Sequence, residues 1–282
     1  MYPPTKIKKN HFTKKKPLVL YNSCTQMSIF DISFYGLHIA PTWYGLSYAL
    51  GFIICYFFVR RYYTFSKKEH IDTLLSYIFV GVILGGRLGY VLLYNLSFFI
   101  EHPIQILYIW QWGMSFHGGF LGVVIAVFLF AKRYRYQFWS LIDTLAVIIP
   151  VALGLGRIGN WINGELPGYN PYDGVFPMMI WLIPHFPSPL LEMLLEGIVL
   201  LIVMMIAWRF WNKKNPWLLS GIFLIGYSVA RLTWEQYRLP DAHIGYLLST
   251  DWVTLGILYT VPMLGYGVYL TYTSIRSRPG SR

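Results

Sequence analysis

Residues 146–168 read AVIIPVALGLGRIGNWINGELPG, and this stretch decides what kind of molecule the chain forms. Its first ten residues are apolar and suit a lipid environment. The thirteen that follow bring an arginine, two asparagines, a glutamate and several glycines. Such a concentration of polar groups at the end of a lipid-compatible segment is unusual, and the remaining sequence indicates its cause.

The composition indicates a polytopic membrane protein. Of 282 residues, 56% are hydrophobic and only 12% are charged, and the mean hydropathy is +0.47. A soluble domain carries about 25% charged residues. The aromatic content of 19% also suits a protein with many tryptophans and tyrosines at the membrane interfaces. The two cysteines, Cys24 and Cys55, provide neither a disulfide framework nor a metal site, and Cys24 is interpreted as incidental.

Hydropathy predicts about seven transmembrane helices and an all-α fold. A helix needs roughly 20 mostly apolar residues to cross a bilayer. Seven segments come close to this, the third and fourth being the shortest: 43–59, 71–93, 116–131, 141–155, 189–210, 217–237 and 253–271. The stretch PMMIWLIPHF at 177–186 is too short and is bracketed by prolines. It is expected to lie at the interface or to re-enter the membrane.

The basic residues predict the orientation of these helices. Thirteen of the 23 lie in alternate connections and at the C-terminus: Arg60, Arg61, Lys67, Lys68, Lys132, Arg133, Arg135, Arg209, Lys213, Lys214, Arg276, Arg278 and Arg282. Basic loops stay in the cytoplasm, so the C-terminus is expected inside and the N-terminus outside. This distribution also argues against nucleic acid as the reason for the net charge of +11.

The N-terminal tail conflicts with this orientation. Six lysines would lie outside the cell: Lys6, Lys8, Lys9, Lys14, Lys15 and Lys16. Residues 1–26 also lack helical periodicity, so they are expected to be disordered or to precede the true start at Met27. The expected domains are this tail, one membrane domain over 27–275, and a short basic tail over 276–282.

Four arginines remain once topology and tail are accounted for, and all lie in or at the outer end of predicted spans: Arg87, Arg157, Arg231 and Arg238. A charged side chain at such a depth is costly and usually faces a cavity or a partner. These four arginines therefore indicate where the chemistry lies.

The sixth predicted span carries a polar stripe formed by Tyr227, Arg231, Glu235 and Arg238. Their spacing of three or four residues places them on one helix face, which is expected to face the bundle interior. An Arg231–Glu235 pair that only locks helices together is one alternative. One carboxylate cannot neutralise two guanidinium groups, however, so an anionic ligand is the other. Arginine suits phosphate through its planar fork of donors.

Two further motifs lie in the second and third spans. Gly81, Gly85 and Gly89 recur every four residues, a spacing that favours close helix packing; Arg87 lies among them, so a backbone neighbour or a polar site is expected nearby. His117, beside Gly118, has a side chain whose reference pKa suits proton transfer. A lone histidine next to glycines is more often structural, and both alternatives stay open.

The motif GRIGNWINGELPG at 156–168 is the strongest indication of a binding site in the sequence. Its glycines are expected to discourage a simple continuous helix, and irregular backbone at membrane depth is tolerated only where it is buried or lines a wet cavity. Arg157, Asn160, Asn163 and Glu165 supply a guanidinium, two amides and a carboxylate within nine residues. A helix cap would need only one of them, so the cluster fits a polar headgroup.

Together, these motifs resemble those of a known family. GLGRIGNWINGELPG closely resembles the hallmark of the prolipoprotein diacylglyceryl transferases of bacteria. Other motifs match in order and spacing: WYGLSY at 43–48, GGRLGYVLLYN at 85–95, GMSFHGGFLG at 113–122 and RLTWEQYRLPD at 231–241. The resemblance runs from about residue 28 to residue 272.

The resemblance implies an activity and a location. The family transfers the diacylglyceryl group of phosphatidylglycerol to the thiol of a lipobox cysteine in the signal peptide of a prolipoprotein, and releases glycerol phosphate. No metal or nucleotide cofactor is implied. The expected location is the bacterial inner membrane, with the protein multi-pass and its active site toward the outer leaflet.

The resemblance also implies roles for individual residues. His117 matches a histidine proposed as the base, and Arg231 and Glu235 match a functional arginine and its helical neighbour. Arg157 matches the arginine that binds the headgroup. Asn160, Gly168, Tyr44 and Tyr227 also match functionally important positions of the family. Four more residues are expected to bind substrate from their place in the motifs alone: Asn163, Glu165, Arg87 and Arg238.

Two departures and two rival functions accompany the resemblance. The lysine-rich tail is unusual for the family, and Pro167 stands where an aromatic or other non-proline residue is expected; it alters the loop locally without removing chemistry. A transporter or channel for an anionic or lipid substrate is the main alternative, although no inverted repeat is evident. A structural scaffold does not explain four such arginines.

Overall fold

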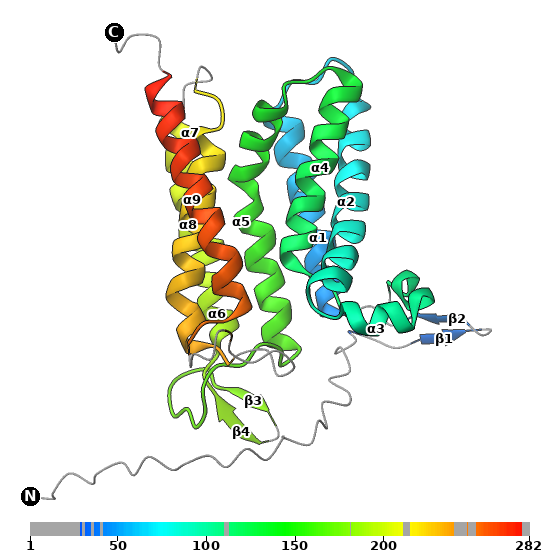
Figure 1. Cartoon of the computed structure of the whole chain (residues 1–282), viewed down its shortest axis with the longest axis vertical. Coiled ribbons are helices and arrows are strands. Elements are labelled where there is room, and N and C mark those ends of the chain that lie inside the picture. Colours follow the sequence, from blue (N-terminus) through cyan, green and yellow to red (C-terminus); the bar gives the residue numbers. More distant parts are fainter. Residues whose placement is uncertain are drawn as a thin grey trace, which may run out of the picture.

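A computed structural model describes residues 29, 32–34, 37–39, 42–109, 113–180, 182–210, 215–239, 247 and 252–277. The described part of the chain is mostly helical, with long helices side by side and two small hairpins at one end of the bundle (Figure 1). The lysine-rich tail and Cys24 lie outside the described residues.

The long helices are α1 (Trp43–Tyr62), α2 (His70–Leu93), α4 (Phe116–Tyr134), α5 (Phe138–Ile162), α7 (Leu200–Phe210), α8 (Leu218–Trp234) and α9 (Leu255–Arg276). Helix α7 continues α6 (Ser188–Glu192) through η2 (Met193–Val199), a π-helical stretch. Shorter elements are α3 (Leu96–Glu101), η1 (Pro103–Leu107) and η3 (Glu235–Tyr237). The strands are β1 (Ile32–Phe34), β2 (Leu37–Ile39), β3 (Met178–Ile180) and β4 (Ile183–His185).

Each segment predicted from hydropathy is helical in the structure, which confirms the mostly helical fold. Within the described residues, four helices are long and apolar enough to cross a membrane: α2, α4, α5 and the continuous helix Ser188–Phe210. Large apolar side chains also cover the outward helix faces, among them Phe57, Leu84, Leu121, Phe128, Ile202 and Tyr269. Faces of this kind suit lipid rather than water, so the chain is a multi-pass membrane protein.

The expectation that glycines break the fourth span is wrong. Helix α5 continues through Gly154, Gly156 and Gly159 to Ile162. Gly154 faces Gly197 of η2, whose Cα would lie 3.2 Å from a Cβ at residue 154. This glycine therefore permits a close helix contact instead of ending the helix. The first irregular glycine is Gly164, which has a φ of +69° in the turn after α5.

The apolar stretch 177–186, expected to lie at the interface or to re-enter the membrane, contains regular β-structure. It forms a β-hairpin in which β3 pairs antiparallel with β4, with Met178 opposite His185. The hairpin lies beyond the helix ends (Figure 1). Its short strands satisfy each other's backbone groups, which the apolar composition alone did not predict.

The glycine pattern of the second span is a packing motif, as predicted. A Cβ at Gly89 would lie 2.6 Å from the Cα of Gly118, and a Cβ at Gly85 would clash with the carbonyl of Gly118. A Cβ at Gly81 would lie 2.6 Å from the carbonyl oxygen of Gly122. Helices α2 and α4 therefore touch through their backbones.

Helix α5 lies at the centre of the bundle. It contacts α1 and α4 on one side and α6, η2, α7 and α8 on the other (Figure 1). One buried apolar cluster includes Leu74, Phe130 and Leu141, and a second includes Met204 and Tyr227. Because α5 packs against so many elements, its polar C-terminal end lies where several helices can contribute side chains.

Candidate functional site

Five charged side chains from three continuous helical stretches, α5, α6–η2 and α8–η3, form one network, which we call the ion-pair cluster. Its members are Arg157 of α5, Glu192 of α6, Glu196 of η2, Arg231 of α8 and Glu235 of η3. Glu192 and Glu196 are almost fully buried, with side-chain exposures of 0% and 1%. Charges at this depth are stable only when they are paired.

Arg157 contacts two carboxylates with three nitrogens. Its Nε and Nη2 donate to Oε2 of Glu196 at 3.0 and 2.9 Å, and its Nη1 lies 2.8 Å from Oε2 of Glu192. The contact with Glu192 is an ion pair without a hydrogen bond, because Oε2 of Glu192 accepts none. A guanidinium has five N–H donors, so three donors of Arg157 have no acceptor among the described residues.

Arg231 is held by its helical neighbour and by the same Glu192. Its Nη2 lies 2.6 Å from Oε2 of Glu235, and its Nη1 lies 3.6 Å from Oε1 of Glu192. At 3.6 Å the second contact is an ion pair without a hydrogen bond, and Nη1 has no hydrogen-bond partner among the described residues. Glu192 thus links the two arginines while one amino group of Arg231 keeps its donors.

Sequence reasoning missed Glu192 and Glu196, although a signal was present. The two glutamates lie four residues apart inside the predicted span 189–210, and acidic residues within a span mark partners or functional sites just as arginines do. The helix is π-helical from Met193 to Val199, and such stretches are frequent at functional sites. This local geometry holds both carboxylates against Arg157.

The charge balance expected from the sixth span alone is wrong. Glu235 is not the sole carboxylate near the arginines, because Glu192 and Glu196 approach from another helix. Arg238 also acts electrostatically on Glu192. The stripe itself is confirmed for Tyr227, Arg231 and Glu235, which are buried at 1%, 8% and 6% exposure. Arg238 instead follows η3 in an extended conformation.

The two asparagines of the opening motif bind its glutamate. Nδ2 of Asn160 donates to Oε2 of Glu165 at 2.7 Å, and Nδ2 of Asn163 donates to Oε1 at 3.2 Å. The amide nitrogen of Glu165 also donates to the carbonyl of Asn160 at 2.9 Å. These bonds close the turn at the end of α5, next to Arg157 in the sequence.

Gly168 connects that turn to the end of the sixth predicted span. It forms an antiparallel bridge with Arg238, and the amide of Leu239 donates to the carbonyl of Pro167 at 3.1 Å. A Cβ at Gly168 would lie 2.7 Å from the carbonyl oxygen of Tyr237. The structure therefore requires glycine here for a close backbone approach, and Pro167 leaves the connection intact.

His117 lies at the start of α4 with both ring nitrogens buried and without hydrogen-bond partners among the described residues. Its ring packs 4.9 Å from that of Tyr259, and Arg231 and Glu235 both act on it electrostatically. Its neighbour Phe116 stacks on Tyr227 at 5.3 Å. His117 is thus brought to the edge of the ion-pair cluster.

Arg87 occupies a different place. It is buried, and its guanidinium donates to the carbonyl oxygens of Gln105, Ile106 and Gly113 at 2.5, 3.0 and 3.2 Å. The predicted backbone neighbour is thereby found, and Arg87 holds the connection between α3 and α4. Tyr44 lies in the first turn of α1, but its side chain lies outside what the structure describes.

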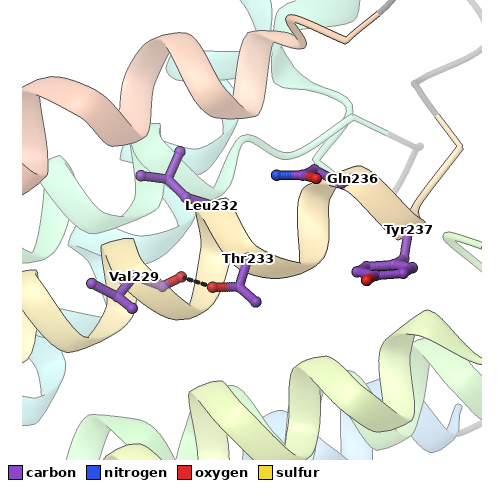
Figure 2. Close-up of a pocket in the computed structure, with 5 residues that line it drawn as sticks. All are labelled: Val229, Leu232, Thr233, Gln236 and Tyr237. Carbon is purple, nitrogen blue, oxygen red and sulfur yellow. Dashed lines mark hydrogen bonds between the residues drawn. The ribbon is translucent and has the colours of Figure 1, made fainter.

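A groove on α8 does not coincide with the ion-pair cluster. Figure 2 shows its lining residues, all from α8 and η3: Val229, Leu232, Thr233, Gln236 and Tyr237. By helical spacing they face away from Arg231. The buried charges therefore define the site better than the groove does. Among the described residues, no group of three His, Cys, Asp or Glu side chains is arranged to hold a metal ion.

Comparison with known proteins identifies the family. The sequence profile of the prolipoprotein diacylglyceryl transferases matches residues 29–273. Three relatives named phosphatidylglycerol–prolipoprotein diacylglyceryl transferase are similar over most of their length. The Rickettsia akari protein is 42% identical over 252 residues, which are 86% of this chain and 96% of the relative.

The Rhizobium meliloti protein is 40% identical over 247 residues, 82% of this chain and 87% of the relative. The protein of Francisella tularensis subsp. holarctica is 41% identical over 247 residues, 84% of this chain and 90% of the relative. With the helical bundle and its buried charges, these matches lead to one conclusion. This chain belongs to the prolipoprotein diacylglyceryl transferase family.

Proposed function

We propose that this chain transfers the diacylglyceryl group of phosphatidylglycerol to the lipobox cysteine thiol in the signal peptide of a prolipoprotein. The relatives are named for these two substrates. The observation that carries the proposal is the pair of arginines Arg157 and Arg231, whose side chains are 14% and 9% exposed. Glu192 links them, and both retain donors without an acceptor among the described residues. Such a pair suits the phosphate of a lipid headgroup.

The reaction exchanges one bond for another at a glycerol carbon. The cysteine sulfur attacks the carbon that carries the phosphate ester, a C–S bond forms and the C–O bond breaks. Glycerol phosphate leaves with the electron pair, and the thiol proton goes to a base or to water. The thiolate is the nucleophile, and an unperturbed thiol with a pKa of about 8.5 supplies little of it at neutral pH.

The two arginines stabilise the leaving phosphate. Arg157 offers its three remaining donors and Arg231 offers Nη1, in a site that is largely screened from bulk water. Preorganised donors aimed at a developing negative charge are the strongest single contribution in many enzymes. The three glutamates hold both guanidinium groups in place, and Glu235 orients Arg231.

The remaining residues bind the substrates or accept the proton. His117 accepts the thiol proton at one of its unpartnered ring nitrogens. Asn160, Asn163 and Glu165 lie one to two turns beyond Arg157 and contact the glycerol of the headgroup, with Gly168 and Arg238 closing that end. Tyr44 and Tyr227 complete the substrate-binding residues, and Arg87 supports the site by fixing the connection to α4.

The topology follows from the basic residues. Seven spans place the N-terminus outside and the C-terminus in the cytoplasm of a bacterium, with the site toward the outer leaflet of the inner membrane. The cytoplasmic ends then include Arg60 and Arg61 of α1, Lys132 and Arg133 of α4, and Arg276 of α9. The family match over 29–273 supports a single catalytic domain over 27–275.

The proposal is tested with purified protein in detergent micelles. The protein is incubated with phosphatidylglycerol and a synthetic lipobox peptide, and the peptide is weighed by mass spectrometry. A mass gain of one diacylglyceryl group on the cysteine is expected, and a Cys→Ser peptide is the matched control. An unmodified peptide after incubation with folded protein contradicts the proposal.

A further inference from the structure

The first turn of α9 contacts the ion-pair cluster from a segment outside all the family-like motifs. Thr254 is the N-cap of α9, and its Oγ1 accepts a hydrogen bond from the amide of Ile257 at 3.3 Å. The same hydroxyl donates to Oε1 of Glu235 at 2.5 Å. Thr254 is 6% exposed, so this bond is protected from water. The hydroxyl therefore connects the start of α9 to the carboxylate that holds Arg231.

Gly256 lies two residues further, against the same ion pair. A Cβ at this position would lie 2.8 Å from Oε1 of Glu235 and 3.0 Å from Nη2 of Arg231. Both atoms are ends of long side chains, so a methyl group here displaces the ion pair and leaves the backbone in place. Gly256 has ordinary helical backbone, and alanine fits a helix better than glycine does.

We propose that Thr254 and Gly256 are positioning residues for diacylglyceryl transfer, because together they fix where the Glu235 carboxylate holds the Arg231 guanidinium. Thr254 binds one carboxylate oxygen, and Gly256 leaves the space that the ion pair occupies. Both residues act through Glu235 and Arg231. The inference rests on the proposed function, in which Arg231 stabilises the leaving phosphate.

The geometry determines which kinetic parameter changes. Arg231 acts on charge that develops in the transition state, so its displacement lowers kcat more than it raises KM for phosphatidylglycerol. A shift of about 1 Å in a catalytic group can cost about 100-fold in rate. The Cβ of alanine at residue 256 demands a displacement of about half this size, because it would lie 2.8 and 3.0 Å from the two atoms and ordinary contacts begin at 3.4 Å.

The first experiment compares two glycines of the same helix. A Cβ at Gly265 would point into open space, with no neighbouring atom of the described residues within 4 Å, so Gly265→Ala is the matched control for Gly256→Ala. Transfer to the lipobox peptide is measured for both variants, together with the midpoint of thermal unfolding. We expect Gly256→Ala to lose at least about tenfold in kcat, with an unfolding midpoint within about 3 °C of that of Gly265→Ala. Equal kcat values overturn the proposal.

The second experiment separates positioning from helix capping at Thr254. Thr254→Ser keeps the hydroxyl and is expected to retain transfer. Thr254→Val has the same shape without the hydroxyl and is expected to lose about tenfold in kcat, since a hydrogen bond to a charged group is removed. Thr254→Asp keeps a good N-cap but places a carboxylate against Glu235, so it is expected to be the least active. A fully active Thr254→Asp or Thr254→Val overturns the proposal.

The inference and the proposed function fail in different ways. If the wild-type protein transfers nothing, the proposed function is wrong and the positioning role falls with it. If the wild-type protein and Gly265→Ala transfer equally well, the proposed function stands. The inference then depends on the ratio of kcat between Gly256→Ala and Gly265→Ala. Should Gly256→Ala fail to fold, the Thr254 series decides alone.

Discussion

Replacing Arg157 by lysine tests whether the shape of the guanidinium matters as well as its charge. In the structure, Nε, Nη1 and Nη2 of Arg157 lie 3.0, 2.8 and 2.9 Å from the carboxylate oxygens of Glu196 and Glu192. The lysine ammonium is a single point donor that cannot reproduce a planar fork. Arg157→Lys therefore keeps the charge but gives up the planar arrangement that leaves three donors for phosphate.

The size of the loss follows from the contacts that disappear. Each hydrogen bond to a charged group contributes about 1.5–3 kcal/mol, and about 1.4 kcal/mol corresponds to a factor of ten. Loss of one bidentate phosphate contact in the transition state, at about 3 kcal/mol, thus lowers kcat/KM by about 100-fold. The folded protein loses less, because the lysine charge still neutralises the buried carboxylates.

The assay is transfer to the lipobox peptide at several phosphatidylglycerol concentrations, with thermal unfolding measured in parallel. Arg133→Lys is the matched control, since Arg133 is exposed in the last turn of α4. It lies at the opposite end of that helix from His117. The control is expected to behave like the wild-type protein. Near-normal kcat/KM in Arg157→Lys would refute the role assigned to the guanidinium.

Three other perturbations address separate features. Glu192→Gln removes the charge that links the two arginines and is expected to lower kcat at least about tenfold, measured by the same transfer assay; an unchanged rate contradicts the linking role. His117→Gln is expected to lower kcat and to flatten the acid limb of the pH–rate profile, because a protonated histidine cannot accept a proton; an unchanged profile and rate rule out the base. Gly118→Leu is expected to prevent α2 and α4 from packing, so the yield of folded protein should fall while that of Gly265→Ala does not; equal yields contradict the packing role.

Hydropathy predicted the positions of the helices well because lipid imposes the same length and composition on every span. Glycines were harder to interpret, since the same residue permits a turn and a close contact. Gly154 has helical backbone and lies against Gly197 of η2, whereas Gly164 has a φ of +69° in the turn after α5. The hairpin at 178–185 was missed because apolar composition does not distinguish short strands from a buried loop.

The sequence predicted only part of the candidate site. The four arginines stood out because few other basic residues lie in the spans, and the motif around Arg157 carried the family resemblance. Their partners were harder to find. Glu192 and Glu196 are on another helix, and Thr254 belongs to none of the motifs recognised in the sequence. Contacts between helices depend on how the bundle packs. The spacing of residues along one helix shows only which side chains share a face of that helix.

The most direct test of the proposed headgroup site is an experimental structure of the protein with bound phosphatidylglycerol in a lipid nanodisc. We expect phosphate oxygens to lie within hydrogen-bond distance, about 3 Å, of both Arg157 and Arg231, with the headgroup glycerol toward Asn160. A phosphate bound in the groove on the opposite face of α8 (Figure 2), or one that contacts neither arginine, would contradict the central claim.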